Sequence, residues 1–94
     1  MSKRDEYVAK MKQQLDEWNE DIGRLQAKVD EATGPAREKL EPHLEKAREG
    51  FEKGKAMLDE MRGAAEDRFD NLKGEAEHVW KALRQSVNYF RSQL

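Results

Sequence analysis

The chain's two histidines are the residues whose types and spacing could do chemistry. Glu75 and His78 are three residues apart, the spacing with which helices of di-metal carboxylate bundles present two ligands on one face. A complete site of that kind needs a second such pair, yet the other histidine, His43, has Leu40 three residues before it. A homodimer could supply the second pair by symmetry. Because the inward positions nearby are apolar, we expect Glu75 and His78 to flank the core in water, and we predict no metal site.

Other catalytic signatures are also missing from the pattern. No serine, cysteine or carboxylate is indicated as a partner for His43, so the sequence does not support a catalytic role for it. The chain has no cysteine, which excludes disulfides, thiolate metal sites and thiol catalysis. Gly50 and Gly54 do not form a phosphate-binding loop, because the Lys-Ser/Thr ending is missing. These glycines either let another helix approach closely or only loosen the second helix. We therefore predict a non-enzymatic protein without a cofactor.

The last part of the chain is basic and amphipathic. Every acidic residue precedes His78, whereas Lys81, Arg84 and Arg91 follow it among aromatic and aliphatic residues. Helices of this composition can lie on anionic membranes or dock on acidic partners. The same pattern is typical of the third helix of a bundle, and both interpretations stay open. Val79 fits the apolar spacing better than Trp80, which leaves open that Trp80 faces outward and anchors a partner.

Composition restricts the class of protein further. The net charge is −2 over 94 residues, and the acidity of the chain before the basic segment argues against nucleic acid as a partner. No apolar run approaches the ~20 residues that span a bilayer, and the opening residues lack the hydrophobic segment of a signal peptide. We expect a cytoplasmic protein.

Long helices must position these side chains. About half of the residues are Ala, Glu, Lys, Leu or Arg, the bias of long helices and coiled coils. Apolar residues recur at alternating steps of three and four in the first third of the chain, which predicts a coiled-coil seam: Val8, Met11, Leu15, Trp18, Ile22, Leu25, Val29 and Ala32. Similar seams follow, one through Leu40, Leu44, Ala47, Phe51, Leu58 and Met61, the other through Ala65, Phe69, Leu72, Ala76, Val79, Leu83, Val87, Phe90 and Leu94.

Two breaks divide the pattern into three segments of similar length. Thr33-Gly34-Pro35 suits a helix end followed by a new start, and Gly63 offers a second break. We predict helices over 3–33, 36–62 and 64–92 in one domain, 1–94, folded as an antiparallel three-helix bundle or coiled coil. The alternative is one long helix with a folded-back C-terminal helix, because the apolar phase continues through the Gly-Pro. Pro42 predicts either a kink or a frayed turn over 35–41.

The aromatic residues allow a finer prediction about the core. In an antiparallel bundle Trp18 and Trp80 both lie near the middle of their helices. With Phe51 at a similar height, the three side chains could form one central aromatic layer.

Two stretches of the sequence carry a family resemblance. KRDEYVAKMKQQLDEWN at the start and DNLKGEAEHVWKALRQSV near the end resemble the small bacterial coiled-coil stress-response proteins of a cyanobacterial type. The matching positions are Lys3 to Val8, Leu15 to Asn19, Asp67 to Gly74, and Trp80 to Leu83, with Phe69 where the family has tryptophan. Gly34, Pro35 and Pro42 depart from the family's usually uninterrupted middle helix. The resemblance implies a cytoplasmic, stress-linked, non-enzymatic helical protein and carries over no catalytic residue.

Taken together, the residues and the resemblance predict a helical interaction or scaffolding protein of bacterial stress response. It would act through its seams, as a homo-oligomer or on a partner helix. Peripheral membrane or lipid-surface binding by the C-terminal helix is the alternative. The candidate interaction residues are Trp18, Leu25, Phe51, Trp80, Lys81, Leu83, Arg84, Phe90 and Arg91.

Overall fold

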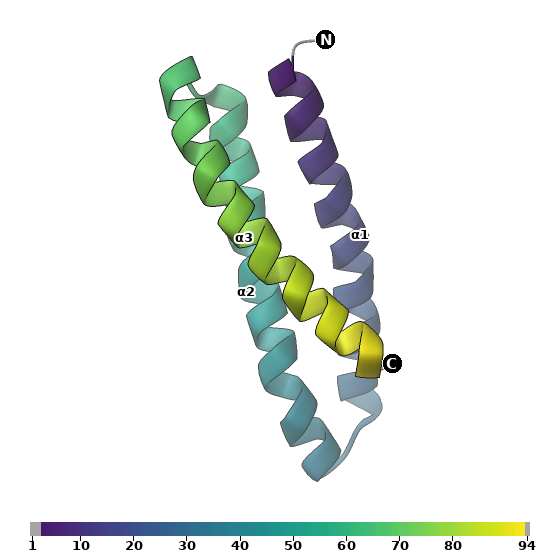
Figure 1. Ribbon diagram of the computed structural model, residues 1–94. Helices are drawn as coiled ribbons and strands as arrows, with labels where there is room; N and C mark the ends of the chain where they lie inside the picture. The colour runs from purple at the N-terminus through teal and green to yellow at the C-terminus, as the bar shows by residue number, and fades with distance from the viewer. Residues whose placement is uncertain (1–2, 94) are drawn as a thin grey trace.

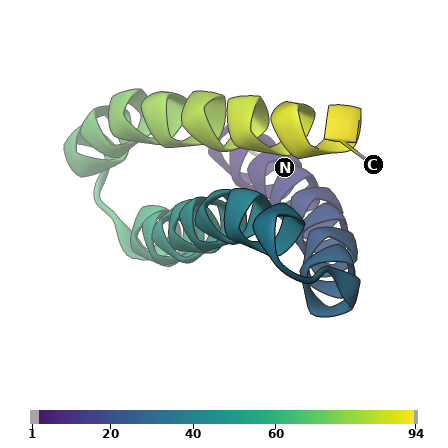
Figure 2. The same cartoon turned by 90° about the horizontal axis from the view of Figure 1, so that it is seen from below.

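The computed structural model describes residues 3–93 of the chain, and within them three helices: α1 (Lys3–Glu31), α2 (Pro35–Gly63) and α3 (Glu66–Gln93). α1 and α2 form an antiparallel hairpin, and α3 runs back across it obliquely, in the same direction as α1 (Figure 1). Seen from the end, α3 covers one side of this hairpin (Figure 2). The bundle is elongated, with extents of 49 × 20 × 18 Å. The predicted all-α, antiparallel three-helix architecture is confirmed.

Both breaks lie close to where the sequence predicts them. Gly34 adopts a φ of 60°, a positive value that a residue without a side chain accepts readily, and Pro35 opens α2 in its fixed helical φ. The chain reverses there, so the alternative of one long helix is wrong. At the second break Ala64 is extended, with ψ at 148°, and its N–H donates to the carbonyl of Met61. α3 therefore begins at Glu66, two residues later than predicted.

Pro42 lies inside α2, as in the helix predicted over 36–62, so the alternative of a frayed turn over 35–41 is wrong. Its ring removes the N–H that would bond the carbonyl of Glu38. Both residues are exposed, so water can reach that carbonyl. The helix continues through the proline because its apolar face is held in the core by Leu44, Ala47, Leu58 and Met61.

The core follows most of the predicted seams of α1 and α3. Of the other seam positions, Ala32 is half-buried, Ala65 is exposed because it lies in the break before α3, and Leu94 lies outside the described residues. The buried apolar side chains of α1 are Val8, Met11, Leu15, Trp18, Ile22, Leu25 and Val29, and those of α3 are Phe69, Leu72, Ala76, Trp80, Leu83, Val87 and Phe90. The prediction that Val79 is the seam residue and Trp80 the outer one is wrong: Trp80 is 2% exposed, whereas Val79 is only half-buried. Because α3 crosses the hairpin obliquely, the residue that follows Ala76 on the buried face is Trp80, four positions later, and not Val79, three positions later.

Glycines of α2 make room for the large side chains of α3. A Cβ placed on Gly54 would lie 3.1 Å from the Trp80 ring and 3.2 Å from Leu15, and one on Gly50 would lie 3.2 Å from Leu83. The indole N–H of Trp80 donates to the carbonyl of Met11 at 3.4 Å. The sequence reading of these glycines as close-approach positions is therefore confirmed.

The predicted central aromatic layer is wrong. Trp80 lies at the height of Met11, seven residues or about 10 Å along α1 from Trp18, and Phe51 is only half-buried. The ring contacts among residues 3–93 join other residues. Tyr7 meets Phe69 edge-on with centroids 6.0 Å apart, and His43 stacks on Tyr89 at 4.2 Å.

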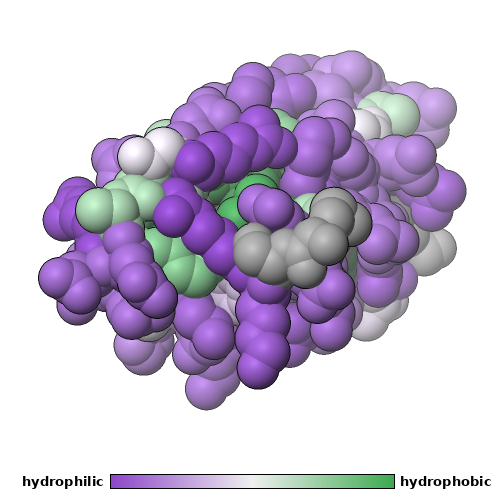
Figure 3. Space-filling model, turned by 90° about the horizontal axis from the view of Figure 1, so that it is seen from above, coloured by the Kyte–Doolittle hydropathy of each residue, from purple (hydrophilic) through white to green (hydrophobic). Residues whose placement is uncertain are grey.

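The surface is dominated by charged and polar side chains. Viewed onto the end where α2 turns into α3, the molecule is mostly hydrophilic, with hydrophobic atoms gathered in a central hollow and a few small patches (Figure 3). The seams are thus largely closed within one chain, and what remains for a partner lies along the edges of the helices.

Candidate functional site

The structure divides the predicted interaction residues into two groups. Five are inside the bundle, with relative exposures of 5% or less: Trp18, Leu25, Trp80, Leu83 and Phe90. Lys81, Arg84 and Arg91 are exposed on α3, and Phe51 is half-buried on α2. The first group holds the chain together and is closed to a partner while the bundle is folded. The alternative that Trp80 faces outward and anchors a partner is wrong for the same reason.

Arg91 belongs to an ion pair that ties the end of α3 to the middle of α1. Its Nη2 lies 2.5 Å and its Nε 3.1 Å from Oδ2 of Asp21, and Arg24 approaches the other carboxylate oxygen to 3.7 Å. Asp21 is the buried charged residue of the described chain, at 5% exposure. Sequence reasoning missed it. The available signal was an acidic residue immediately before Ile22, at the flank of the first seam, where interhelical ion pairs form.

The same end of α3 also contacts α2, through an aromatic stack. The His43 and Tyr89 rings stack with an interplanar angle of 30°, and Tyr89 keeps 38% of its surface exposed. His43, for which the sequence supports no catalytic role, is half-buried in this contact. Together with Arg91, this stack fixes the C-terminal turns of α3 against both other helices.

At the opposite end, Arg4 fastens the start of α1 to the end of α2. Its Nη2 donates to the carbonyls of Met61 at 2.6 Å and Arg62 at 3.2 Å. These carbonyls lie in the last turn of the helix, where the negative end of the helix dipole favours a cation. The guanidinium carbon also lies 5.0 Å from the centre of the Phe69 ring, so one side chain joins all three helices.

Tyr7 lies beside these contacts of Arg4. Its hydroxyl is buried and, among the described residues, is the buried side-chain polar atom that lacks a hydrogen bond. Burial raises the pKa of Tyr7 above 10.0, and the negative charge of Glu77 raises it further. Lys73 lies over the ring, with Nζ 5.0 Å from its centre. Tyr7 thus occupies a half-buried position between α1 and α3 in which the neutral phenol is favoured.

A basic groove runs between α1 and α3 beyond Tyr7. Its volume is about 470 Å³. The floor includes Met11 and Trp80, and the rim includes the predicted Lys81 and Arg84. The two predicted basic residues therefore do lie together, but on the edge of a groove whose apolar floor is part of the core.

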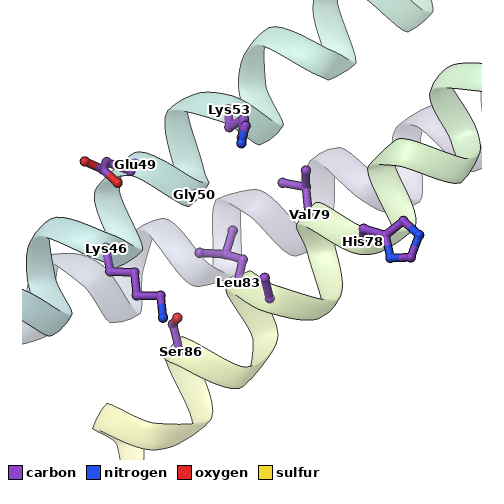
Figure 4. Close-up of a pocket in the computed structure, with 9 residues that line it drawn as sticks. Lys46, Glu49, Gly50, Lys53, His78, Val79, Leu83 and Ser86 are labelled. Carbon is purple, nitrogen blue, oxygen red and sulfur yellow. The ribbon is translucent and has the colours of Figure 1, made fainter.

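A second groove lies between α2 and α3, with a volume of about 340 Å³. Val79 and Leu83 point into it below Gly50, and Lys46 extends toward Ser86 across the opening (Figure 4). His78 lines the same groove next to Val79 (Figure 4).

Among the described residues, the pair that the sequence offered as possible metal ligands, Glu75 and His78, has no further metal-binding side chains grouped around it. Glu75 and His78 are both exposed on α3. Within residues 3–93, no group of three or more His, Asp or Glu side chains is placed to hold a metal ion.

Two further grooves lie along the junction of α1 and α2. They have volumes of about 260 and 430 Å³, and Phe51 lines both. The first continues past Leu15 and Leu58, the second past Ile22 and Gly23. Phe51 is thus a half-buried aromatic ring at the centre of the surface formed by these two helices.

None of the helices within residues 3–93 combines the length and apolar character needed to cross a membrane. Comparison of the chain with protein-family models, with curated proteins and with solved structures finds no match.

Proposed function

We propose that this chain is a non-enzymatic helical interaction protein of bacterial stress physiology that works by helix-on-helix contact, with another copy of itself as its first partner. The observation that carries the proposal is that polar and charged side chains of the chain hold its helices against one another. Arg4, His43 and Arg91, which could serve chemistry elsewhere, instead join helices. The link to stress rests on the resemblance of residues 3–19 and 67–83 to the bacterial stress-response family.

The arrangement of the α1–α2 surface supports helix contact as the mode of action. α3 lies against one side of the hairpin (Figure 2), and Phe51 remains half-exposed on the junction of α1 and α2. Charged side chains surround this ring, among them Lys12 and Lys55 on one side and Arg48 on the other. An aromatic ring within a charged rim suits a partner helix better than a small substrate.

Binding of the C-terminal helix to a membrane is the second candidate, and the structure limits how it could occur. The apolar face that would enter a lipid surface includes Leu83, Val87 and Phe90, each at most 2% exposed. Lipid binding therefore requires α3 to leave the bundle and to break the Arg91–Asp21 pair. We expect the folded protein to remain unbound.

Two measurements test the proposed function. Liposome flotation with neutral and anionic vesicles separates the candidates: protein that floats only with anionic lipid supports the membrane role, and protein that stays at the bottom supports the interaction role. In the source bacterium, a strain lacking the protein should survive osmotic or oxidative stress less well. Wild-type protein should restore survival, and unchanged survival of the deletion strain would contradict the stress role.

A further inference from the structure

The outer edge of α2 carries a regular line of alternating charge. Its members are separated by steps of three and four residues, are all exposed, and alternate strictly in sign: Glu45, Arg48, Glu52, Lys55, Asp59 and Arg62. We name this set the α2 charge stripe. It covers about 25 Å of helix and borders the α1–α2 grooves, since Arg48 and Glu52 line one of them and Lys55, Asp59 and Arg62 the other.

The stripe is complementary to itself when two copies of α2 run antiparallel. A two-fold axis passing between Lys53 and Gly54 places positions at equal distances from that midpoint opposite each other. Glu52 then faces Lys55, Arg48 faces Asp59, and Glu45 faces Arg62 of the second copy. All three pairs are opposite in sign, and the symmetry doubles each of them.

The neighbouring exposed line on α2 does not have this property. Lys46, Glu49, Lys53 and Glu60 also alternate in sign. Antiparallel pairing of Lys46 with Glu60 places Lys53 against Lys53 of the second copy, where two like charges repel. In the register that matches its outermost charges, the edge beside α3 therefore brings like charges together, whereas the α2 charge stripe pairs all of its charges with opposite ones.

Phe51 lies where such a pairing needs an apolar centre. It is two and a half residues from the midpoint of the stripe, so the two Phe51 residues would be about 7.5 Å apart along the helices. The ring is half-buried, and the facing edge of α1 carries Asn19 and Gly23 beside it. No heavy atom lies within 4 Å of a Cβ built on Gly23, so a second helix can approach closely there.

We infer that the α2 charge stripe and Phe51 form a homodimer interface in which α2 pairs antiparallel with α2 of a second copy. The inference rests on the proposed function and specifies its partner and surface. Local ion pairs within one helix, such as Asp59 with Arg62 at 3.8 Å, can exchange for intermolecular ones because all six side chains are exposed. The α1–α2 hairpins then form the centre of the dimer, with α3 on the outside of each copy.

The test is a charge-swap experiment by sedimentation equilibrium on the full chain at low salt, where surface pairs are least screened. Wild-type protein should show a monomer–dimer equilibrium. Glu52→Lys places lysine opposite Lys55 of the second copy, and Lys55→Glu places glutamate opposite Glu52. Each variant alone should weaken dimerisation by at least about tenfold. An equimolar mixture of the two restores opposite charges only across the interface, and should dimerise at least as well as the wild type.

Controls separate the interface from effects on folding. Glu75→Lys makes the same charge change on the exposed side of α3 and should leave dimerisation unchanged. Phe51→Ala should weaken dimerisation while circular dichroism still shows a folded helical protein.

Three results would overturn the inference: a wild-type chain that stays monomeric throughout the concentration series, a dimer insensitive to both swaps, or a mixture that does not recover. The first would leave the stress role to be judged by the survival test. The other two would overturn this surface alone, because self-association would persist or the swaps would act within one chain.

Discussion

Replacing Arg91 with methionine should destabilise the bundle, although Arg91 lies in the last turn of its last helix. Asp21 has a side-chain exposure of 7%, and Arg91 provides its hydrogen bonds at 2.5 and 3.1 Å. After the substitution the carboxylate keeps Arg24, which is 3.7 Å away and itself 71% exposed. An almost buried carboxylate would then lack a hydrogen-bonded cation.

The magnitude follows from the exposure of the two partners. Removing one partner from a fully buried ion pair costs about 3–5 kcal/mol, whereas an exposed pair contributes about 0.2–1 kcal/mol. Asp21 is buried but Arg91 is 52% exposed, so we expect a loss of about 2 kcal/mol in the free energy of unfolding. For a domain of this size that corresponds to a melting temperature lower by about 10 °C.

The assay is urea and thermal unfolding followed by circular dichroism at pH 7, on five variants: Arg91→Met, Asp21→Leu, the double variant of these two, Arg91→Lys and Arg84→Met. The double variant Asp21→Leu with Arg91→Met removes both charges and should recover most of the loss, because no unpaired carboxylate remains in the core. Arg91→Lys keeps the charge without the planar guanidinium and should lie between Arg91→Met and wild type. Arg84→Met, at an exposed position of the same helix, should change stability by less than about 0.5 kcal/mol.

Two outcomes would refute this reasoning. One is an Arg91→Met variant within about 0.5 kcal/mol of the wild type, since the pair would then contribute no more than an ordinary surface contact. The other is a double variant that loses as much as the sum of its single substitutions, since the two side chains would then act independently.

Three further predictions concern single positions. Tyr7→Phe should raise the free energy of unfolding by about 1 kcal/mol at pH 7, because it removes a buried hydroxyl without a hydrogen bond. Burial raises the pKa of Tyr7, so above pH 10.0 the unfolded chain loses the phenol proton before the folded one does. The free energy of unfolding therefore falls as the pH rises. A pH series of urea melts should show this fall in wild type and a smaller one in Tyr7→Phe. Gly54→Ala should destabilise the fold by about 1 kcal/mol, since overpacking against the Trp80 ring outweighs the gain in helix propensity. Gly74→Ala, where the added Cβ meets no other residue within 4 Å, should stabilise it by about 1 kcal/mol. Equal shifts in the melting temperatures of the two variants would contradict the packing assignment. Leu25→Glu puts a carboxylate at a site with 0% exposure and should abolish the cooperative melt, and an unchanged melting curve would show that this position is not in the core.

The architecture was readable from the sequence because it depends on local signals. The three-and-four spacing of residues such as Leu15 and Trp18 predicts the buried face of α1 regardless of what covers it. The Gly34-Pro35 pair predicts the reversal from backbone geometry alone. Pro42 lies within the helix predicted over 36–62. The sequence left a frayed turn open there because a proline is unfavourable in an isolated helix, whereas in the fold the packed face on the other side of α2 holds the helix together.

The polar contacts were less readable, because they depend on the height at which one helix crosses another. Nothing local to Arg91 indicates that it meets Asp21, seventy residues earlier. The oblique course of α3 decides this, and the same course turns Trp80 inward and Val79 toward the edge. The basic amphipathic end suggests a membrane helix by composition, but in the fold its apolar face is buried and one of its three cations, Arg91, is paired with Asp21. By contrast, the α2 charge stripe is legible in the sequence once the structure shows which edge of α2 is exposed, since its complementarity requires only a second copy of the same helix running the other way.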